Sequence, residues 1–250
     1  MAPAHPDSQR LAAGWQALER NDLDAAEAAA RRVLAQEPQD IESQRLLGAS
    51  LLFQERFQEA LAPLRYAHLH GPKRGSGHRL GYCHLALGDF SSAVEVLERE
   101  AREFPDLVNA RAALGVALVQ LSRREEALAV FLEATRLDPG SVASHTNAGN
   151  VLAELGRHDE ALVHLRQAVQ AQPGLADLHF NLGIELQRLK RHDEARRSLQ
   201  AALDIAPHMP YALGNRVWNE LAACQWTTIE RGIDELRRQV RDAGIPAAPF

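Results

Sequence analysis

The chain has 250 residues, of which 46% are hydrophobic and 24% charged, and its formal net charge is −5. The hydrophobic share excludes a wholly disordered chain, and the acidic balance argues against nucleic-acid binding, which needs a basic face to neutralise phosphates. Alanine is abundant, with 42 copies, whereas aromatic residues make up 5%. That composition favours helices that pack closely through small side chains.

The cysteine content and the first residues of the chain favour a reducing compartment. Cys83 and Cys224 are too few for a disulfide framework or a metal cluster, which favours a reducing compartment. The first residues lack the apolar core of a signal peptide, and no uncharged apolar run approaches the ~18 residues of a membrane span. We therefore expect a cytoplasmic protein that does not associate with a membrane.

A glycine, an alanine and a proline recur in fixed phase six times. The glycines are Gly14, Gly48, Gly81, Gly115, Gly149 and Gly183, spaced 33 or 34 residues apart. An alanine stands 12 residues after each glycine, and a proline 12 residues after each alanine. This pattern over residues 7–209 resembles the tetratricopeptide repeat. The resemblance implies six repeats, at 7–40, 41–74, 75–107, 108–141, 142–175 and 176–209.

Each repeat predicts two antiparallel helices. In repeat 142–175 the apolar spacing favours one helix over about 144–155, ending at Gly156, and a second over about 159–171. The repeated glycine and alanine let the two helices approach closely, and the proline stops the second helix. One hairpin buries too little surface to be stable, so the repeats must stack. We expect an all-α, right-handed α-solenoid with a concave groove lined by the first helices.

The two ends of the chain depart from the repeat. We expect residues 1–6 to be disordered and residues 210–250 to form a capping helix pair and a linker. The capping helices are predicted at 211–224 and about 228–243, the second with Ile229, Ile233, Leu236 and Val240 on one face. Such atypical ends cover the last apolar face of a solenoid.

The turn at 71–77 is one residue shorter than its equivalents. It holds three glycines in seven residues, so we expect few packed contacts there and the loosest joint of the stack. The alternative is a tolerated irregularity without a role.

No pattern in the sequence predicts catalysis, a cofactor or a metal. Cys83 and His84 are adjacent on one helix and cannot form a nucleophile–base pair, and His84 takes a leucine position of the repeat core. The histidines at 68, 70, 78 and 84 lack a cysteine or carboxylate that would complete a metal site. His158 and His192 lie 34 residues apart in turns, where exposure to solvent is expected.

A row of asparagines is the strongest candidate for a binding site. Asn147, Asn181 and Asn215 stand two residues before the repeat glycine or its equivalent, and Asn150 follows one helical turn later. Equivalent positions of a solenoid form a row, and an amide can donate to and accept from a peptide backbone. We favour a groove that binds polypeptide. The alternative is that these amides bond neighbouring helix backbones.

The same repeats resemble those of a known enzyme family. Asn147-Ala-Gly-Asn150, Gly156-Arg-His-Asp-Glu-Ala161 and Asn181-Leu-Gly183 are similar to repeats of O-linked N-acetylglucosamine transferases and SPINDLY-like proteins. Tyr211-Ala-Leu-Gly-Asn215, Cys224-Gln-Trp226 and Pro249-Phe250 resemble the segment that leads into the catalytic domain of bacterial members, with Gln225 in place of the usual aspartate.

That resemblance implies a non-catalytic, substrate-recognition region of a bacterial protein glycosyltransferase, with the catalytic domain beyond Phe250. The rival interpretation is a free-standing adaptor that assembles a complex. Neither interpretation predicts the identity of the partner protein, the donor sugar or the oligomeric state.

Overall fold

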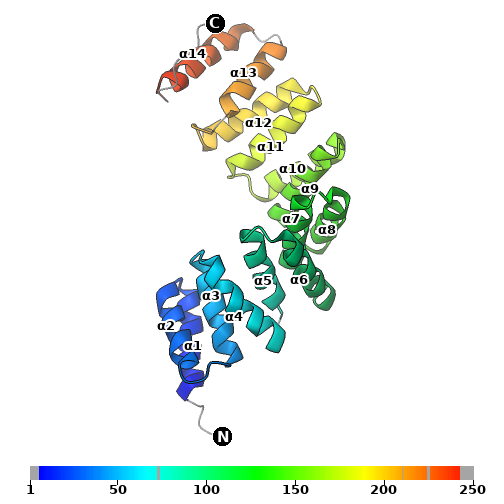
Figure 1. Ribbon diagram of the computed structural model, residues 1–250. Helices are drawn as coiled ribbons and strands as arrows, with labels where there is room; N and C mark the ends of the chain where they lie inside the picture. The colour runs from blue at the N-terminus through cyan, green and yellow to red at the C-terminus, as the bar shows by residue number, and fades with distance from the viewer. Residues whose placement is uncertain (1–5, 72–73, 210, 224–225, 243–250) are drawn as a thin grey trace. The chain divides into compact units, whose positions relative to one another are not determined.

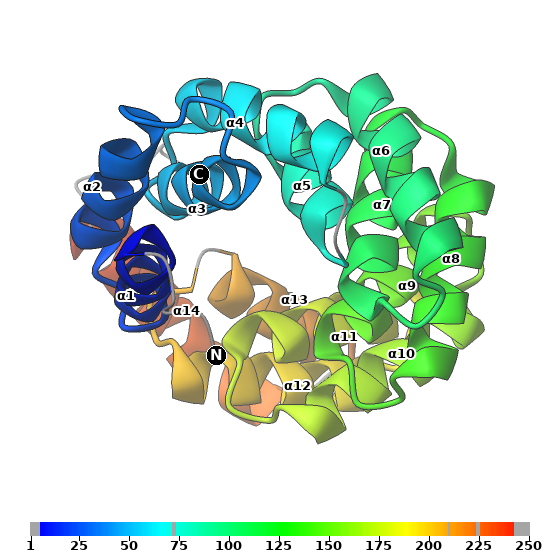
Figure 2. The ribbon, with the colours of Figure 1, turned by 90° about the horizontal axis from the view of Figure 1, so that it is seen from below.

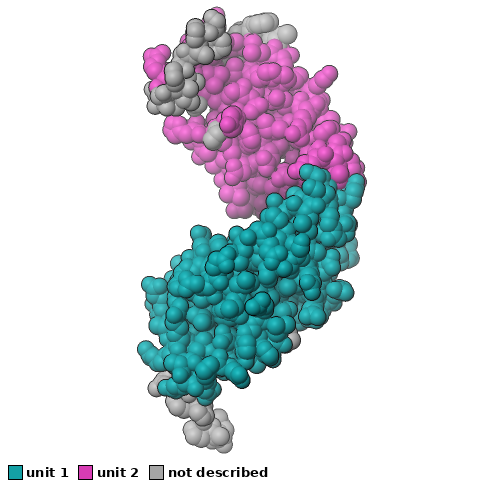
Figure 3. Space-filling view, in the orientation of Figure 1, with its two compact units in different colours: residues 1–137 teal, residues 138–250 magenta. Residues whose placement is uncertain are grey.

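The computed structural model describes residues 6–71, 74–209, 211–223 and 226–242, and within them every regular element is an α-helix (Figure 1). The chain divides into two compact units, residues 1–137 and 138–250 (Figure 3). Each unit is a stack of consecutive helix hairpins, which confirms the predicted all-α repeat fold. The expectations for residues 1–5, Cys224, Gln225 and 243–250 lie outside the described residues.

Within each hairpin we call the odd-numbered helix A and the even-numbered helix B. Unit 1 contains α1 (Pro6–Glu19), α2 (Leu23–Leu34), α3 (Ile41–Phe53), α4 (Phe57–His70), α5 (Ser76–Ala86), α6 (Phe90–Glu103), α7 (Val108–Gln120) and α8 (Arg124–Leu137). Unit 2 contains α9 (Val142–Glu154), α10 (His158–Ala171), α11 (Ala176–Arg188), α12 (His192–Ile205), α13 (Ala212–Ala222) and α14 (Trp226–Asp242). In unit 1 the helices α3, α5 and α7 lie on one side of the stack and α4, α6 and α8 on the other, and in unit 2 α9, α11 and α13 are likewise separated from α10 and α12 (Figure 2).

The repeat glycine allows the two helices of a hairpin to touch. A Cβ added to Gly48, Gly81, Gly149 or Gly183 would lie 2.4 to 2.8 Å from the leucine four residues past the repeat alanine. All six repeat alanines are 0% exposed. A glycine and an alanine are therefore required at these positions because the partner leucine occupies the space that a larger side chain would need.

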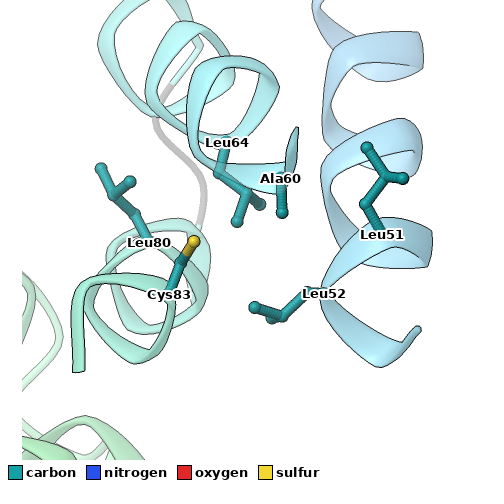
Figure 4. Close-up of a cluster of buried hydrophobic side chains, with 6 residues drawn as sticks. All are labelled: Leu51, Leu52, Ala60, Leu64, Leu80 and Cys83. Carbon is teal, nitrogen blue, oxygen red and sulfur yellow. The ribbon is translucent and has the colours of Figure 1, made fainter. Parts of the chain in front are cut away.

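Consecutive hairpins are joined by apolar packing. In unit 1, Leu51 and Leu52 of α3 and Leu64 of α4 meet Leu80 and Cys83 of α5 in one buried cluster (Figure 4). Burying a leucine side chain contributes about 1.5–3 kcal/mol to folding. Such clusters between hairpins therefore supply stability that a single hairpin lacks.

Every A helix from α1 to α11 is followed by one residue in the left-handed backbone conformation. Positive φ values of 59 to 75° occur at Asn21, Glu55, Gly88, Ser122, Gly156 and Lys190. The next amide then bonds a carbonyl five residues back, as Arg157 N does to Leu152 O at 2.8 Å. These are Schellman ends, which satisfy carbonyls that the helix leaves unpaired. The predicted end at Gly156 is confirmed, although four equivalent turns use other residues.

The short turn at 71–77 is held by a buried carboxylate. Glu100 of α6 is 1% exposed and accepts hydrogen bonds from the backbone amides of Gly75 and Gly77, the latter at 3.0 Å. Both amides lie at the start of α5, where helix N–H groups lack partners. Arg45 Nη2 also donates to the Gly71 carbonyl. The expectation of few packed contacts is therefore wrong for the described residues of this turn.

The last two helices cover the end of unit 2. Leu213 and Val217 of α13 pack with Leu203, and Ile233 and Leu236 of α14 lie against them. The capping pair expected at 211–224 and 228–243 is found as α13 and α14. Nothing is described for the side chain of Val240.

Candidate functional site: the asparagine row of unit 2

The asparagines predicted to form a row lie on consecutive A helices of unit 2. Asn147 is on α9, Asn181 on α11 and Asn215 on α13, and all three are half-buried. The residues that follow each of the first two, such as Ala148 and Leu182, are buried in the hairpin. Asn150, one turn along α9, is exposed. We call these four residues the asparagine row.

The hydrogen bonds of the row distinguish its members. Asn215 Nδ2 donates to the Tyr211 carbonyl of its own helix at 2.8 Å. Within the described residues, the amides of Asn147 and Asn181 have no hydrogen-bond partner. An amide with both its donor and its acceptor unused can bond a backbone laid across it. The alternative, that these amides bond neighbouring helix backbones, differs from this bond, because Asn215 donates to the N-cap carbonyl of its own helix.

A second row runs beside the first and was not predicted from the sequence. Ile184 and Trp218 occupy the repeat position of Asn150, 34 and 68 residues along the chain. Ile184 is half-buried, and Trp218 is 48% exposed with its ring edge-on to His192 at a centroid distance of 5.4 Å. Their spacing of 34 residues was the available signal. On α11 and α13, an apolar side chain therefore stands three residues after the asparagine, whereas α9 has a second asparagine at that position.

Buried polar contacts hold the helix that carries Asn215. Asn219 of α13 is 0% exposed, and its Nδ2 donates to Gln187 Oε1 of α11 at 2.8 Å. Its Oδ1 lies 2.9 Å from His192 Nδ1, so the imidazole donates to the amide oxygen. This network fixes α13 against α11 and α12, and thereby the spacing of the row.

The same contact recurs one repeat earlier with a carboxylate. His158 Nδ1 bonds Glu185 Oε1, and Arg188 Nη1 lies 3.1 Å from Glu185 Oε2. Glu185 is 2% exposed. The expectation that His158 and His192 are solvated turn residues is therefore wrong, because each bonds the next A helix. Glu185 and Asn219 also lie 34 residues apart, a signal that the sequence offered.

Two histidines, His145 of α9 and His164 of α10, contact one another in the first hairpin of unit 2. His145 Nε2 lies 3.1 Å from the Pro139 carbonyl, which can only accept, so this nitrogen carries the proton. His145 Nδ1 then accepts from His164 Nδ1 at 3.0 Å. Burial lowers the pKa of His164, and the neighbouring His145 lowers it further. The neutral form of His164 is thus favoured in the folded protein.

Cys83 and His84, which are adjacent on α5, do not bond one another in the structure. Cys83 is a buried free thiol, and burial raises its pKa to about 11, so it carries little of the reactive thiolate. His84 Nδ1 bonds Asp89 Oδ2 at 3.1 Å rather than Cys83. Within the described residues, no three histidine, cysteine or acidic side chains are placed to hold a metal ion.

Comparison with known proteins places the sequence among helical repeats. Two sequence profiles, both described as the tetratricopeptide repeat, match residues 140–208 and residues 11–70 and 78–142. A comparison with curated proteins finds no match. Within the described residues, no helix is long and apolar enough to cross a membrane.

Three solved structures illustrate the likeness. A thermophilic TPR protein of Thermus thermophilus is 26% identical over 74% of this chain and 99% of that one, with a TM-score of 0.55. YrrB, described as a TPR protein with an unusual peptide-binding site, is 23% identical over 74% and 96%, with a TM-score of 0.61. One chain of the APC/C hetero-tetramer Cut9–Hcn1 is 21% identical over 86% of this chain and 43% of that one, with a TM-score of 0.72.

Proposed function

Since the chain belongs to the tetratricopeptide repeat family, whose members are protein-interaction scaffolds, we propose that its asparagine row binds an extended polypeptide. The observation that carries the proposal is the pair of unbonded amides on α9 and α11. Backbone N–H and C=O groups of an extended segment are alike in every residue, so such binding has little sequence preference. The domain binds its partner without catalysing a reaction.

Two further findings support a peptide ligand. YrrB, a protein of the same fold, is described as having an unusual peptide-binding site. In this chain the asparagine row is uncharged, so its hydrogen bonds do not depend on pairing with an acidic or basic partner. Binding should consequently respond only weakly to salt.

Alanine substitution tests the row directly. Each net hydrogen bond contributes about 0.5–1.5 kcal/mol, so one asparagine-to-alanine change should weaken the binding of an unfolded polypeptide a few-fold. Changing Asn147, Asn181 and Asn215 together should lose roughly 1.5–4 kcal/mol if the contributions add. Asn109→Ala, at an exposed asparagine of α7 in unit 1, is the matched control. Unchanged affinity in the triple variant, with helicity equal to the parent, would reject the proposal.

We further propose that this domain selects substrates for a bacterial protein glycosyltransferase of the O-linked N-acetylglucosamine transferase type, in the reducing cytoplasm. The short motifs within residues 211–250 that resemble the segment before the catalytic domain support the assignment, and the buried free thiol of Cys83 fits a reducing compartment. The coding sequence after Phe250 tests it. Two Rossmann-like halves with a nucleotide-sugar site would support the proposal, whereas a stop codon would favour the free-standing adaptor.

The intact enzyme would give a functional test. The triple asparagine change should lower transfer to protein acceptors and spare hydrolysis of the sugar donor, because the donor site lies elsewhere. Equal loss of both rates, or loss of neither, would show that the row does not select substrates.

A further inference from the structure

A cavity of about 330 Å³ lies among α4, α5 and α6 of unit 1. Arg65 and His68 from α4, His84 from α5, and Glu95, Arg99 and Arg102 from α6 line it. Its size falls within the range of small-ligand pockets. It takes no part in the asparagine row, which belongs to unit 2.

Two departures from the repeat meet in this cavity. His84 takes the position at which other A helices carry Leu51, Leu118, Leu152 and Leu186. His68 stands eight residues after the repeat alanine, where the other B helices carry Leu34, Ala101, Thr135, Val169 and Leu203. His68 Nδ1 lies 3.1 Å from Ser76 Oγ, and His84 Nδ1 bonds Asp89. The sequence therefore replaces apolar or small side chains with imidazoles at two positions that line one space.

The charges of this cavity are unbalanced. Three guanidinium groups face one carboxylate, Glu95, and within the described residues neither Arg65 nor Arg99 has an ion-pair partner. The next cavity along the B helices, about 380 Å³, is lined by Arg102, Arg111, Glu98 and Glu133, and there Arg111 lies 3.3 Å from Glu133. Similar space between neighbouring repeats is thus neutralised in one case and left positive in the other.

We propose that the cavity among α4, α5 and α6 binds a phosphate ester. A guanidinium presents paired N–H donors that match phosphate oxygens, and several of them favour a doubly charged anion. The side chains of Leu80 and Val96, which also line the cavity, offer an apolar wall to the organic part of the ester. A metal cation is disfavoured because the three arginines repel it. The ester can come from a phosphorylated residue of a partner protein or from a free phosphorylated metabolite.

Titration calorimetry on the full chain tests the proposal. The probes are phosphoethanolamine and a capped peptide with a central phosphoserine, compared with ethanolamine and the unphosphorylated peptide. We expect binding that requires the phosphate and weakens about tenfold or more in Arg65→Gln/Arg99→Gln, the loss expected for charged hydrogen bonds. Both arginines are exposed, so the variant should keep its helicity.

The control is Arg32→Gln, because Arg32 holds in α2 the repeat position that Arg99 holds in α6 and lines none of these cavities. The Arg32→Gln variant should bind the phosphorylated probes with an affinity within about twofold of the parent's. His84→Leu, which restores the leucine of the repeat, should lower affinity without lowering stability. Peptide binding tighter than that of phosphoethanolamine would identify a phosphoprotein as the source, and equal affinities a free metabolite. Equal binding of phosphorylated and plain probes, or no loss in the double variant, would overturn the proposal.

Discussion

Hairpins in the two units are built on the same contact but present different side chains on their A helices. Gly81 packs on Leu97 in unit 1 just as Gly183 packs on Leu199 in unit 2. Two residues before the glycine, or before Val217, which takes its place in α13, the helices α3, α5 and α7 carry Leu46, Arg79 and Ala113, whereas α9, α11 and α13 carry asparagine. The comparison shows that packing keeps a glycine at the first position in both units, while the second position is occupied by a buried leucine in α3 and by half-buried amides in unit 2.

The contacts between hairpins differ in the same way. Two residues after the glycine, α3, α5 and α7 have the small residues Ser50, Cys83 and Ala117, of which Cys83 donates to the Phe57 carbonyl of the preceding hairpin at 3.2 Å, whereas α11 and α13 have the longer side chains of Glu185 and Asn219. The latter two bond His158 and His192 of the preceding hairpin. Both units therefore have a polar contact between hairpins at this position, made by a thiol to a backbone carbonyl in unit 1 and by a carboxylate or an amide to a histidine ring in unit 2.

The largest effect is expected at Glu100, which has no counterpart in unit 2. Glu100→Ala would leave the Gly75 and Gly77 amides without acceptors and open a cavity, at a cost of about 2–4 kcal/mol. Denaturant unfolding would measure the loss, and faster hydrogen exchange should appear at the start of α5 and not in α9 to α13. Glu103→Ala, at an exposed residue of the same helix, is the control. Similar stability of the two variants would show that Glu100 does not hold the turn.

Substitutions that overpack the repeat glycine contact should lower the stability of both units by similar amounts. Gly149→Leu or Ala161→Leu would overpack the contact between α9 and α10 and lower the free energy of unfolding by about 1–3 kcal/mol. Gly115→Leu, against Phe131 in unit 1, should cost a similar amount. Gly174→Ala is the control, because a Cβ there meets nothing within 4 Å. Thermal melts of the leucine variants that coincide with the parent would mean that the repeat core is misassigned.

Asn219 should matter more to stability than any residue of the asparagine row. Asn219→Ala removes buried hydrogen bonds to Gln187 and His192 and should cost about 1–2 kcal/mol. Asn150→Ala, at an exposed position, should stay within about 0.5 kcal/mol of the parent. A reversed order of the two variants in urea unfolding would contradict the division between structural and binding amides.

The smallest effect is a pH dependence in unit 2. The unfolded chain protonates His164 near the ordinary imidazole pKa of ~6.5, whereas burial lowers the pKa of His164 in the folded protein. Its contribution to stability is therefore complete above that ordinary value, decreases as the pH falls below it, and levels off beneath the folded pKa. His164→Gln should reduce the loss of stability between pH 7 and 5 relative to the parent. Identical pH profiles of stability for the variant and the parent would contradict this.

The helix hairpins and their spacing along the chain were predictable from the sequence. The glycine and alanine are required where the two helices of a hairpin touch, and the proline ends the second helix. The helix ends were predictable only in part, since Glu55, Ser122 and Lys190 adopt the left-handed conformation that the sequence marks at Gly156. Such residues take a strained backbone when tertiary packing fixes the turn. The glycine-rich turn at 71–77 was misjudged for a related reason, because Glu100 is distant in sequence and only the fold brings it to α5.

The asparagine row was predictable in position but not in bonding. Repeat spacing places Asn147, Asn181 and Asn215 equivalently, yet Asn215 uses its donor within α13. The partners of His158 and His192 escaped prediction because a contact between consecutive hairpins joins residues 27 apart, and not residues at the repeat period.

The central claim is that Asn147 and Asn181 bind the backbone of an extended peptide. The most direct measurement compares an unfolded peptide with its backbone N-methylated counterpart on the parent and on Asn147→Ala/Asn181→Ala. Methylation removes N–H donors and should weaken binding to the parent by about 0.5–1.5 kcal/mol per lost bond. We predict that this loss shrinks or disappears in the variant, which gives a coupling free energy between the peptide backbone and the two amides. An equal loss on both proteins would contradict the account.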